Sequence, residues 1–385
     1  MKLQFTKISL FVLSLCLFGT TLSFGAENND EPTAENEEAK EESAVPEEKS
    51  PLEISGFIDT YYRYSNVKES LTSFADGNNS FSLGMANIVF SKQVGNVGFV
   101  ADLAVGPRAI QANGQAIETD DGTIVDNNLS IIKQLYVTWA ATEKLTFTMG
   151  NFSTHVGYEL IDANGNYNYS TSYLFSNGPF YHTGVKADYA FSDKFAVMAG
   201  IFNETDTKFA SINPKYFGGQ IFFAPVEGWD VYLNYIGGSA DGDLVFTQEF
   251  DITTTYTVND DFLIGFNGAI APTTIKDEAG DITDQFSGAA MYLNYSLSEK
   301  FGLGFRGEYF ATSVKQENFD GSTKINATAL TLSGNYNIGP LRLIPEIRYD
   351  VLSDNIDDMD VQFTNLDGTM QNSGFQAMLA AVFSF

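Results

Sequence analysis

The chain contains few of the side chains on which catalysis or metal binding usually depends. It has two histidines, His155 and His182, and a single cysteine, Cys16. Ser153 lies two residues before His155, but no third group follows at a spacing that would orient the imidazole as a general base. The sequence also lacks a phosphate-binding glycine loop and paired His or Cys ligands at zinc spacing. We therefore expect no enzyme activity and no cofactor, and we assign no catalytic or metal-binding residue.

The charged residues instead recur at alternate positions of segments whose other positions are apolar. In residues 244–258, Phe246 and Phe250 alternate with Glu249 and Asp251. A period of two is that of a β-strand with two different faces. Because a charge facing lipid near the bilayer midplane costs about 2–4 kcal/mol, we expect the charged faces to line an aqueous lumen or to form ion pairs that brace its wall. The expected lumen-wall residues are Asp59, Arg63, Asp102, His182, Lys186, Asp188, Glu249, Asp251, Arg306, Glu308, Arg342, Glu346, Arg348 and Asp350.

The segments that carry these faces are long, and their connections come in two kinds. Each segment has about nine to fourteen residues, the length that a tilted strand needs to cross a membrane. Short turns near residues 95, 143, 193, 227, 260, 299 and 339 separate them on one side. Mostly longer, polar connections alternate with these turns, near 67–79, 106–130, 153–179, 203–215, 239–243, 272–285, 315–324 and 353–372. This layout predicts an all-β fold, a transmembrane antiparallel β-barrel of about 16 strands.

The first 50 residues are expected to precede the barrel. Residues 1–26 combine two lysines, an apolar run at 8–18 and small residues before position 27, the pattern of a cleaved signal peptide. Lipidation of Cys16 is disfavoured because Leu15 precedes it. Residues 27–50 hold ten acidic residues, two lysines and no aromatic residue, and are expected to be a disordered leader, either a solvated spacer or a docking segment. The barrel domain is then 51–385.

Net charge and aromatic content restrict the class of partner. The chain carries 49 acidic and 21 basic residues, a formal charge of −28, which argues against nucleic acid as a ligand. Residues 1–26 carry +2 and 27–50 carry −8, which leaves −22 on the barrel domain. Trp139 and Trp229 lie beside short turns, where an aromatic girdle at the membrane edge is expected. In a soluble β-protein the same aromatic residues would form the core.

The last strand is expected to mark the chain for membrane assembly. Its apolar face consists of Phe375, Ala377, Leu379, Ala381, Phe383 and Phe385. A terminal strand that ends on an aromatic residue resembles the signal that outer-membrane barrels present to their assembly machinery. We therefore expect this machinery, outer-membrane lipid and lipopolysaccharide to be partners. The sequence also leaves a homo-oligomer open.

A family resemblance is carried by residues 150–191. The relevant motifs are Gly150-Asn151-Phe152, Gly157-Tyr158-Glu159, Asn166-Tyr167-Asn168-Tyr169-Ser170, Ser172-Tyr173, Gly178-Pro179 and His182-Thr183-Gly184. This stretch resembles the segment shared by the OmpL-like outer-membrane β-barrel porins. The resemblance implies a bacterial outer-membrane barrel with porin function, and it supplies no catalytic residue. The remainder of residues 52–385 agrees with the family in organisation.

The same stretch contains the longest expected connection, 153–179, which is polar and nearly uncharged. A loop that folds into a lumen needs such residues, because its backbone must bond to water and to wall side chains. The candidate constriction residues are Tyr158, Glu159, Asn166 and Tyr169. The alternative is an outer cap over the barrel mouth. We expect the loops at 106–130 and 353–372, which carry several acids, to remain in the outside water.

These features together predict an outer-membrane porin, a passive diffusion channel for small hydrophilic solutes. The predicted wall carries eight acidic and five basic residues, so a weak preference for cations is expected. The alternatives are a structural or binding barrel without a channel, such as an adhesin or an envelope scaffold, and, less favoured, an outer-membrane hydrolase.

Overall fold

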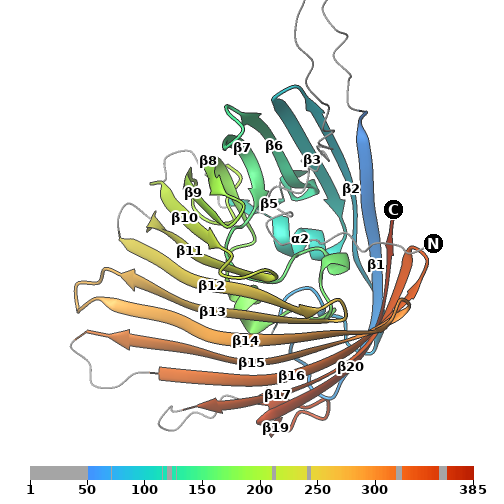
Figure 1. Cartoon of the computed structure of the whole chain (residues 1–385). Coiled ribbons are helices and arrows are strands. Elements are labelled where there is room, and N and C mark those ends of the chain that lie inside the picture. The colour runs from blue at the N-terminus through green and yellow to red at the C-terminus, as the bar shows by residue number, and fades with distance from the viewer. Residues whose placement is uncertain are drawn as a thin grey trace, which may run out of the picture.

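The chain forms one closed antiparallel barrel of sixteen strands in the computed structural model (Figure 1). The structure describes residues 51–70, 72–114, 116–118, 124–126, 128–209, 214–240, 244–317, 323–354 and 362–385. The predicted barrel fold and its strand number are therefore confirmed. The predicted signal peptide, 1–26, and acidic leader, 27–50, lie outside the described residues and stay predictions.

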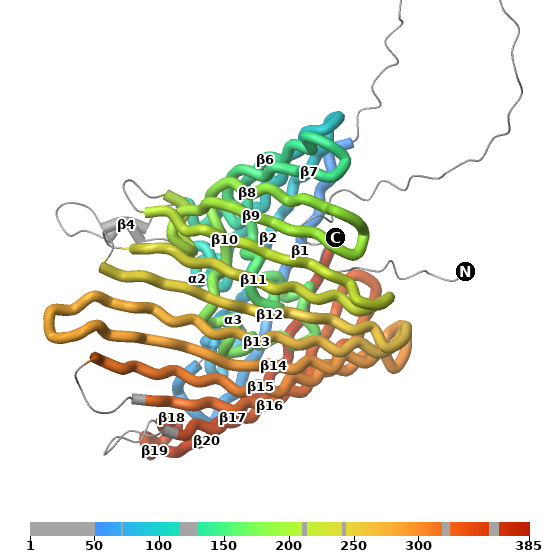
Figure 2. Tube along the Cα trace, turned by 60° about the vertical axis from the view of Figure 1, so that its left-hand side comes forward, coloured from blue at the N-terminus to red at the C-terminus, as the bar shows by residue number. Residues whose placement is uncertain are grey.

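Neighbours around the wall are also neighbours in the sequence. The barrel strands are β1 (Glu53–Ser65), β2 (Ser80–Val94), β3 (Val97–Val105), β6 (Ile132–Ala140), β7 (Leu145–Ser153), β8 (Tyr181–Ser192), β9 (Phe195–Phe202), β10 (Tyr216–Phe223), β11 (Trp229–Ala240), β12 (Val245–Asn259), β13 (Phe262–Ile275), β14 (Ile282–Ser298), β15 (Phe301–Gln316), β16 (Thr323–Ile338), β17 (Leu341–Asp354) and β20 (Ser373–Ser384). Figure 2 shows that the wall is tall along β12–β17 and lower along β6–β10.

The connections add small elements. Two short sheets pair β4 (Ala116–Glu118) with β5 (Ile124–Asp126) and β18 (Phe363–Thr364) with β19 (Met370–Gln371). The helical segments are α2 (Pro107–Asn113), η1 (Asn128–Ile131), η2 (Ala163–Gly165) and α3 (Tyr173–Asn177). Within the described residues, no helix has the length and apolar character needed to cross a membrane.

Short turns alternate with mostly longer connections, as predicted, but the boundaries shift and the connection 241–244 is no longer than the turns 141–144 and 224–228. The expected loops 239–243, 272–285 and 315–324 shrink to 241–244, 276–281 and 317–322. The strands continue past the apolar region as polar hairpins, in which Thr273 pairs with Asp284 and Thr274 with Thr283. Backbone pairing in these hairpins does not require an apolar face, so the sequence pattern ends before the strand does.

The two faces of each strand differ as the alternation predicts. On β12, Phe250 is 49% exposed on the outer surface, whereas Glu249 is 7% exposed on the inner side. Trp139 and Trp229 are exposed on the outer surface beside short turns, and Trp139 stacks on Phe147 with 5.6 Å between ring centroids. The outer surface is thus apolar, as contact with lipid requires.

The first and last strands close the barrel. β20 pairs with both β17 and β1, so no strand edge is left unpaired in the wall. Phe385 extends this seam, because its N–H donates to Gly56 O (3.0 Å) and its carbonyl accepts from Gly56 N (3.1 Å).

We expect removal of Phe385 to lower the amount of assembled barrel, because it deletes both seam hydrogen bonds and the terminal aromatic side chain. The measurement is the fraction of membrane-inserted protein that migrates as the folded band in unheated gel samples. Phe385→Tyr keeps the seam and the ring and should assemble like the parent. Unaltered insertion of the truncated chain would contradict the terminal-strand argument.

Candidate functional site

The connection between β7 and β8, residues 154–180, folds into the barrel, and we call it the inner loop. Asn168 Nδ2 donates to Ser333 Oγ (2.7 Å), and Asn335 Nδ2 donates to Tyr167 O (3.0 Å). Ser333 and Asn335 lie in the half of β16 nearer its short turn. The inner loop therefore reaches deep into the lumen, and the outer-cap alternative is wrong for this segment.

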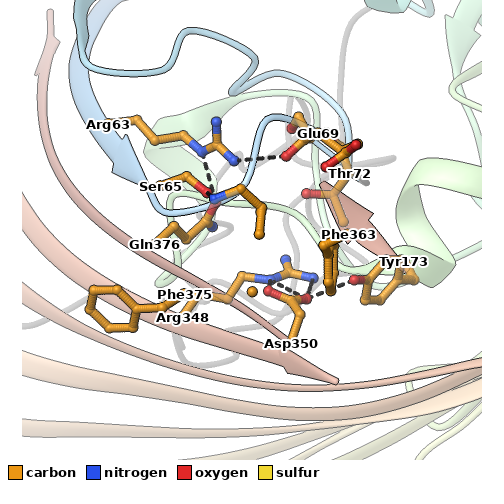
Figure 3. Close-up of a pocket in the computed structure, with 13 residues that line it drawn as sticks. Arg63, Ser65, Glu69, Thr72, Tyr173, Arg348, Asp350, Phe363, Phe375 and Gln376 are labelled. Carbon is orange, nitrogen blue, oxygen red and sulfur yellow. Dashed lines mark hydrogen bonds and ion pairs between the residues drawn. The ribbon is translucent and has the colours of Figure 1, made fainter. Parts of the chain in front are cut away.

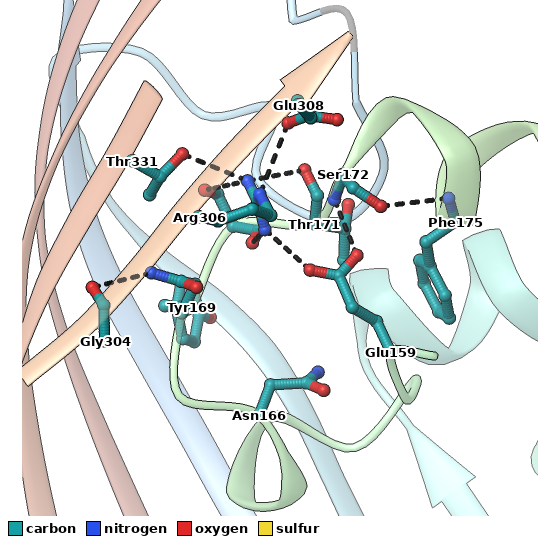
Figure 4. A network of polar contacts seen from close by, with 12 residues as sticks. Glu159, Asn166, Tyr169, Thr171, Ser172, Phe175, Gly304, Arg306, Glu308 and Thr331 are labelled. Atoms are coloured by element: carbon teal, nitrogen blue, oxygen red, sulfur yellow. Dashed lines mark hydrogen bonds and ion pairs between the residues drawn. The ribbon is translucent and has the colours of Figure 1, made fainter. Parts of the chain in front are cut away.

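Arg306 on β15 holds two parts of the inner loop at once (Figure 4). Its Nη1 lies 2.6 Å from Glu159 Oε1 and also donates to Ser170 O (2.5 Å). The second oxygen of Glu159 accepts the N–H of Ser172 (2.7 Å). Because the side chain of Glu159 is only 4% exposed, its charge serves to fasten the loop and is not presented to the lumen.

Acidic wall residues accept hydrogen bonds from the backbone of the inner loop. Glu346 on β17 accepts the N–H groups of Tyr169 (2.7 Å) and Ser170 (3.1 Å). Glu308 on β15 accepts the N–H of Tyr173 (2.7 Å). These bonds satisfy backbone donors that would otherwise be buried without a partner.

Arg348 on β17 supplies the complementary donor. Its Nη1 donates to Thr171 O (2.7 Å), and its other nitrogens pair with Asp350 (2.7–3.0 Å). Tyr173 Oη also donates to Asp350 (2.7 Å). The start of α3 is thus fixed to the wall by charge-assisted hydrogen bonds.

A second long connection enters the barrel beside the inner loop. Arg108, in α2, is fully buried; it donates to Ile161 O (3.1 Å) and lies 3.7 Å from Asp59. Tyr169 Oη donates to the same Asp59 carboxylate (2.5 Å). We expected 106–130 to stay in the outside water, and this is wrong for 107–113. α2 carries a single charge, and Asp59 and the ring of Tyr169 provide partners for it.

The opposite side of the inner loop is tied by one lysine. Lys133 on β6 contacts Asp102 on β3 (2.5 Å) and Asp162 of the loop (2.8 Å). Asn166, a constriction candidate, bonds within the loop to the N–H and the carbonyl of Leu160 (3.0 and 2.7 Å). Tyr158, another candidate, stacks on Tyr292 of β14 at 4.2 Å.

Most of the wall charges expected at the lumen are covered. Asp188 and Arg342 are half-buried, and Arg342 donates to Ala163 O (2.7 Å). The others are buried on the inner side, namely Asp59, Arg63, Asp102, His182, Lys186, Glu249, Asp251, Arg306, Glu308, Glu346, Arg348 and Asp350. Along β1, β3, β15 and β17 the charges act as ion pairs and loop anchors. These strands therefore do not form the acidic, water-lined wall that the sequence predicted.

Open space remains on the other side of the inner loop. A cavity of about 150 Å³ lies between residues 153–162 and the wall; among its lining residues are Lys133, Tyr136, Phe152, Lys186, Gln220 and Tyr232. A second cavity of about 50 Å³ shares Gln220 with it and extends to the short turn that carries Glu143 and Lys144. The two cavities follow β6–β11 toward the turn side of the barrel.

The covered side offers much less room. The cavity in Figure 3, between Arg63, Arg348, Asp350 and Gln376, has a volume of about 20 Å³. That volume holds about one water molecule. Within the described part of the barrel interior, the larger cavities therefore lie beside β6–β12.

A family model described as "Putative beta-barrel porin-2, OmpL-like" matches residues 51–385. The chain belongs to this family. No curated protein matches the sequence. The resemblance noted in residues 150–191 is thereby confirmed. Both the family and the fold indicate a porin-type barrel of the bacterial outer membrane.

Solved outer-membrane proteins share the fold at low sequence identity. The in-vitro folded OmpT of Vibrio cholerae is 14% identical, with a TM-score of 0.55, over 89% of this chain and 100% of that one. An anion-selective porin from Comamonas acidovorans is 14% identical, with a TM-score of 0.53, over 87% and 99%. The outer membrane channel DcaP of Acinetobacter baumannii is 11% identical, with a TM-score of 0.54, over 87% and 97%.

Sequence reasoning missed two groups of residues at this site. Arg108 and Lys133 lie outside the strand parity used to find wall charges. Gly265 and Gly304 leave room for the loop, because an added Cβ would meet Tyr158 Oη at Gly265 and would lie 2.9 Å from Tyr167 Cβ at Gly304. A glycine at an inward position of a long strand is the signal that could have been used.

We expect Glu159→Gln to destabilise the barrel, because it removes one of the two buried carboxylates that pair with Arg306 and leaves only Glu308, at 3.3 Å. Breaking one partner of a buried pair costs about 3–5 kcal/mol. The measurement is the urea unfolding midpoint of the detergent-folded protein, followed by tryptophan fluorescence. Glu299→Gln, in an exposed turn, is the control and should leave the midpoint unchanged. Equal midpoints for both variants would show that the pair does not hold the loop.

Proposed function

We propose that this barrel is a passive diffusion channel for small hydrophilic solutes, with a weak preference for cations. The observation that carries the proposal is a pair of cavities that share Gln220: one lies between the inner loop and the wall, and the other lies along the wall toward the short turn at Glu143. A sixteen-stranded wall is too wide for its own side chains to fill, so a loop that packs against one side leaves a path along the other.

The residues beside this path suit neutral polar solutes as well as ions. Lys133 is neutralised by Asp102 and Asp162, and Lys186 lies 3.2 Å from Asp188. The path therefore has little net charge of its own. We propose that Tyr158, Glu159, Asn166 and Tyr169 narrow the lumen by setting the position of the inner loop, while Lys186 and Gln220 border the open path.

Cation preference is proposed to arise at the mouths. Exposed acids outnumber exposed lysines in the short turns. The acids are Glu143, Asp193, Glu227, Asp260, Asp261 and Glu299, and the lysines are Lys144, Lys194 and Lys300. An excess of negative charge at a channel mouth raises the local concentration of cations.

Export by a cleaved signal peptide, contact with lipopolysaccharide and the assembly machinery, and self-association belong to the same proposal. A trimer form has been solved for the V. cholerae OmpT, which supports a homo-oligomer here. We propose no catalysis, since His155 already bonds to a backbone carbonyl. A structural or binding barrel is the second candidate, because anchors on β1, β6 and β15–β17 tie the inner loop across the lumen.

We expect cation-preferring conductance in planar bilayers at low salt, fading as salt rises. The Debye length falls from about 10 Å at 0.1 M to about 3 Å at 1 M, so charges at the mouth lose their reach. The measurement is the reversal potential in a KCl gradient. Glu143→Lys, beside the second cavity, should weaken the preference more than Glu299→Lys. Anion preference at low salt would contradict the proposed origin, and absence of conductance would favour the structural barrel.

We expect Gln220→Trp to reduce single-channel conductance, because residue 220 borders both cavities. Ile221→Trp is the matched control, since Ile221 lies next to it on β10 but is exposed on the outer surface. Conductance that is equal in the two variants would place the path elsewhere. Folding of both is checked by the shift of the unheated band.

A further inference from the structure

The only two histidines of the chain meet at the root of the inner loop. His155 comes from the loop and His182 from β8, and their ring centroids are 5.0 Å apart. Phe202 on β9 stacks on His182 at 4.9 Å. Gly218 on β10 leaves room for His155, because a Cβ there would lie 2.8 Å from the imidazole. Residues separated by 27 positions are thus packed as one unit.

The hydrogen bonds of this pair fit neutral imidazoles. His155 Nε2 lies 3.0 Å from Tyr235 O, and since a carbonyl only accepts, this nitrogen carries the proton. His182 Nε2 lies 2.9 Å from Thr154 Oγ1. The other nitrogen of His182, Nδ1, has no hydrogen-bond partner in the described structure, and the residue is 0% exposed. An added proton on Nδ1 would therefore be buried without an acceptor.

The charged groups around the two histidines do not stabilise a protonated imidazole. Lys186 lies four residues after His182 on β8, and its positive charge acts on both rings. Its partner Asp188 is already engaged (3.2 Å). Asp251 on β12 accepts the N–H of Gly157 (3.3 Å) and the amide of Asn234 (2.6 Å). On the loop after β9, Asp206 accepts the N–H groups of Phe180 and Tyr181 (2.7 and 3.0 Å).

We propose that His155 and His182 form a proton-sensitive latch: they hold the root of the inner loop against the wall while neutral, and acid releases it. The latch acts on the open path, since His155 and Thr154 border the cavity of about 150 Å³. This regulation rests on the proposed channel function. A released imidazolium enters that cavity, and so brings bulk and positive charge into the path.

The direction of the effect follows from linkage. Burial lowers the pKa of His155 to about 4, below the value of about 6.5 for an exposed histidine. The held state binds the proton less well than the released state, so the latch is stable above pH 6.5 and weakens as pH falls toward 4. Each pH unit in that window shifts the equilibrium by up to about tenfold per histidine.

The test combines a pore measurement with a direct observation of the imidazoles in the full-length mature barrel without a histidine tag. Single-channel conductance and reversal potential are recorded from pH 7.5 to 4.5 at constant salt. Nitrogen NMR of ¹⁵N-histidine-labelled protein in micelles reports the two rings separately from all other residues. We expect both rings to stay neutral at pH 6 and then to titrate together as conductance and cation preference fall.

Variants separate the pair from other acid-sensitive groups. His155→Gln with His182→Phe keeps a donor for Tyr235 O and a ring against Phe202, and it should conduct without the transition. Asp206→Asn is the matched control, because burial raises the pKa of Asp206 to about 6, and it should retain the transition. A transition that persists in the double variant or disappears in Asp206→Asn would overturn the latch.

The NMR arm also keeps the two proposals distinct. Rings that titrate separately near pH 6.5 would overturn the latch, and this outcome can be observed even if the double variant does not fold. Conductance that stays constant while the rings titrate would also overturn it. If the barrel conducts at no pH, the channel proposal fails, and the joint late titration of the rings still tests whether the pair is held neutral.

Discussion

The backbone of the inner loop must find hydrogen-bond partners inside the barrel, and the charged side chains of the wall provide them. A loop placed in a lumen leaves the N–H and carbonyl groups of its residues without strand neighbours. Glu346 and Glu308 accept the N–H groups of residues 169, 170 and 173, while Arg306 and Arg348 donate to the carbonyls of residues 170 and 171. A loop with few charges and a charged wall are therefore two parts of one arrangement.

This arrangement explains why the interior is asymmetric. The anchoring charges are concentrated on β15 and β17, with Asp59 on β1 and Asp102 on β3, so these strands lie against the loop and α2. Inward glycines such as Gly265 and Gly304 allow the backbone of the loop to approach the wall. The space that the loop does not use remains beside the lower strands β6–β10 and the adjoining β11 and β12.

The charges of the barrel consequently have two different roles. Buried residues such as Arg306 and Glu159 lie against opposite charges and hold the loop in position, because an unmatched charge there would be costly. Exposed acids in the turns contribute instead to the field at the mouth. The excess of negative charge in the sequence therefore does not translate into an acidic lumen.

The sequence by itself determined the elements of the wall. The period of two, the strand length, the alternation of turns and the outward Phe and Trp residues depend on near neighbours and on the membrane, and all can be recognised from local sequence. Tertiary structure decided which inward charges meet water. Glu346 and Tyr169 are 177 positions apart, and Arg108 and Ile161 are 53 apart. Parity shows that a side chain points inward but does not specify what lies opposite, so the covered wall, the entry of residues 107–113 and the contact between the two histidines became visible only when the barrel closed around its loop.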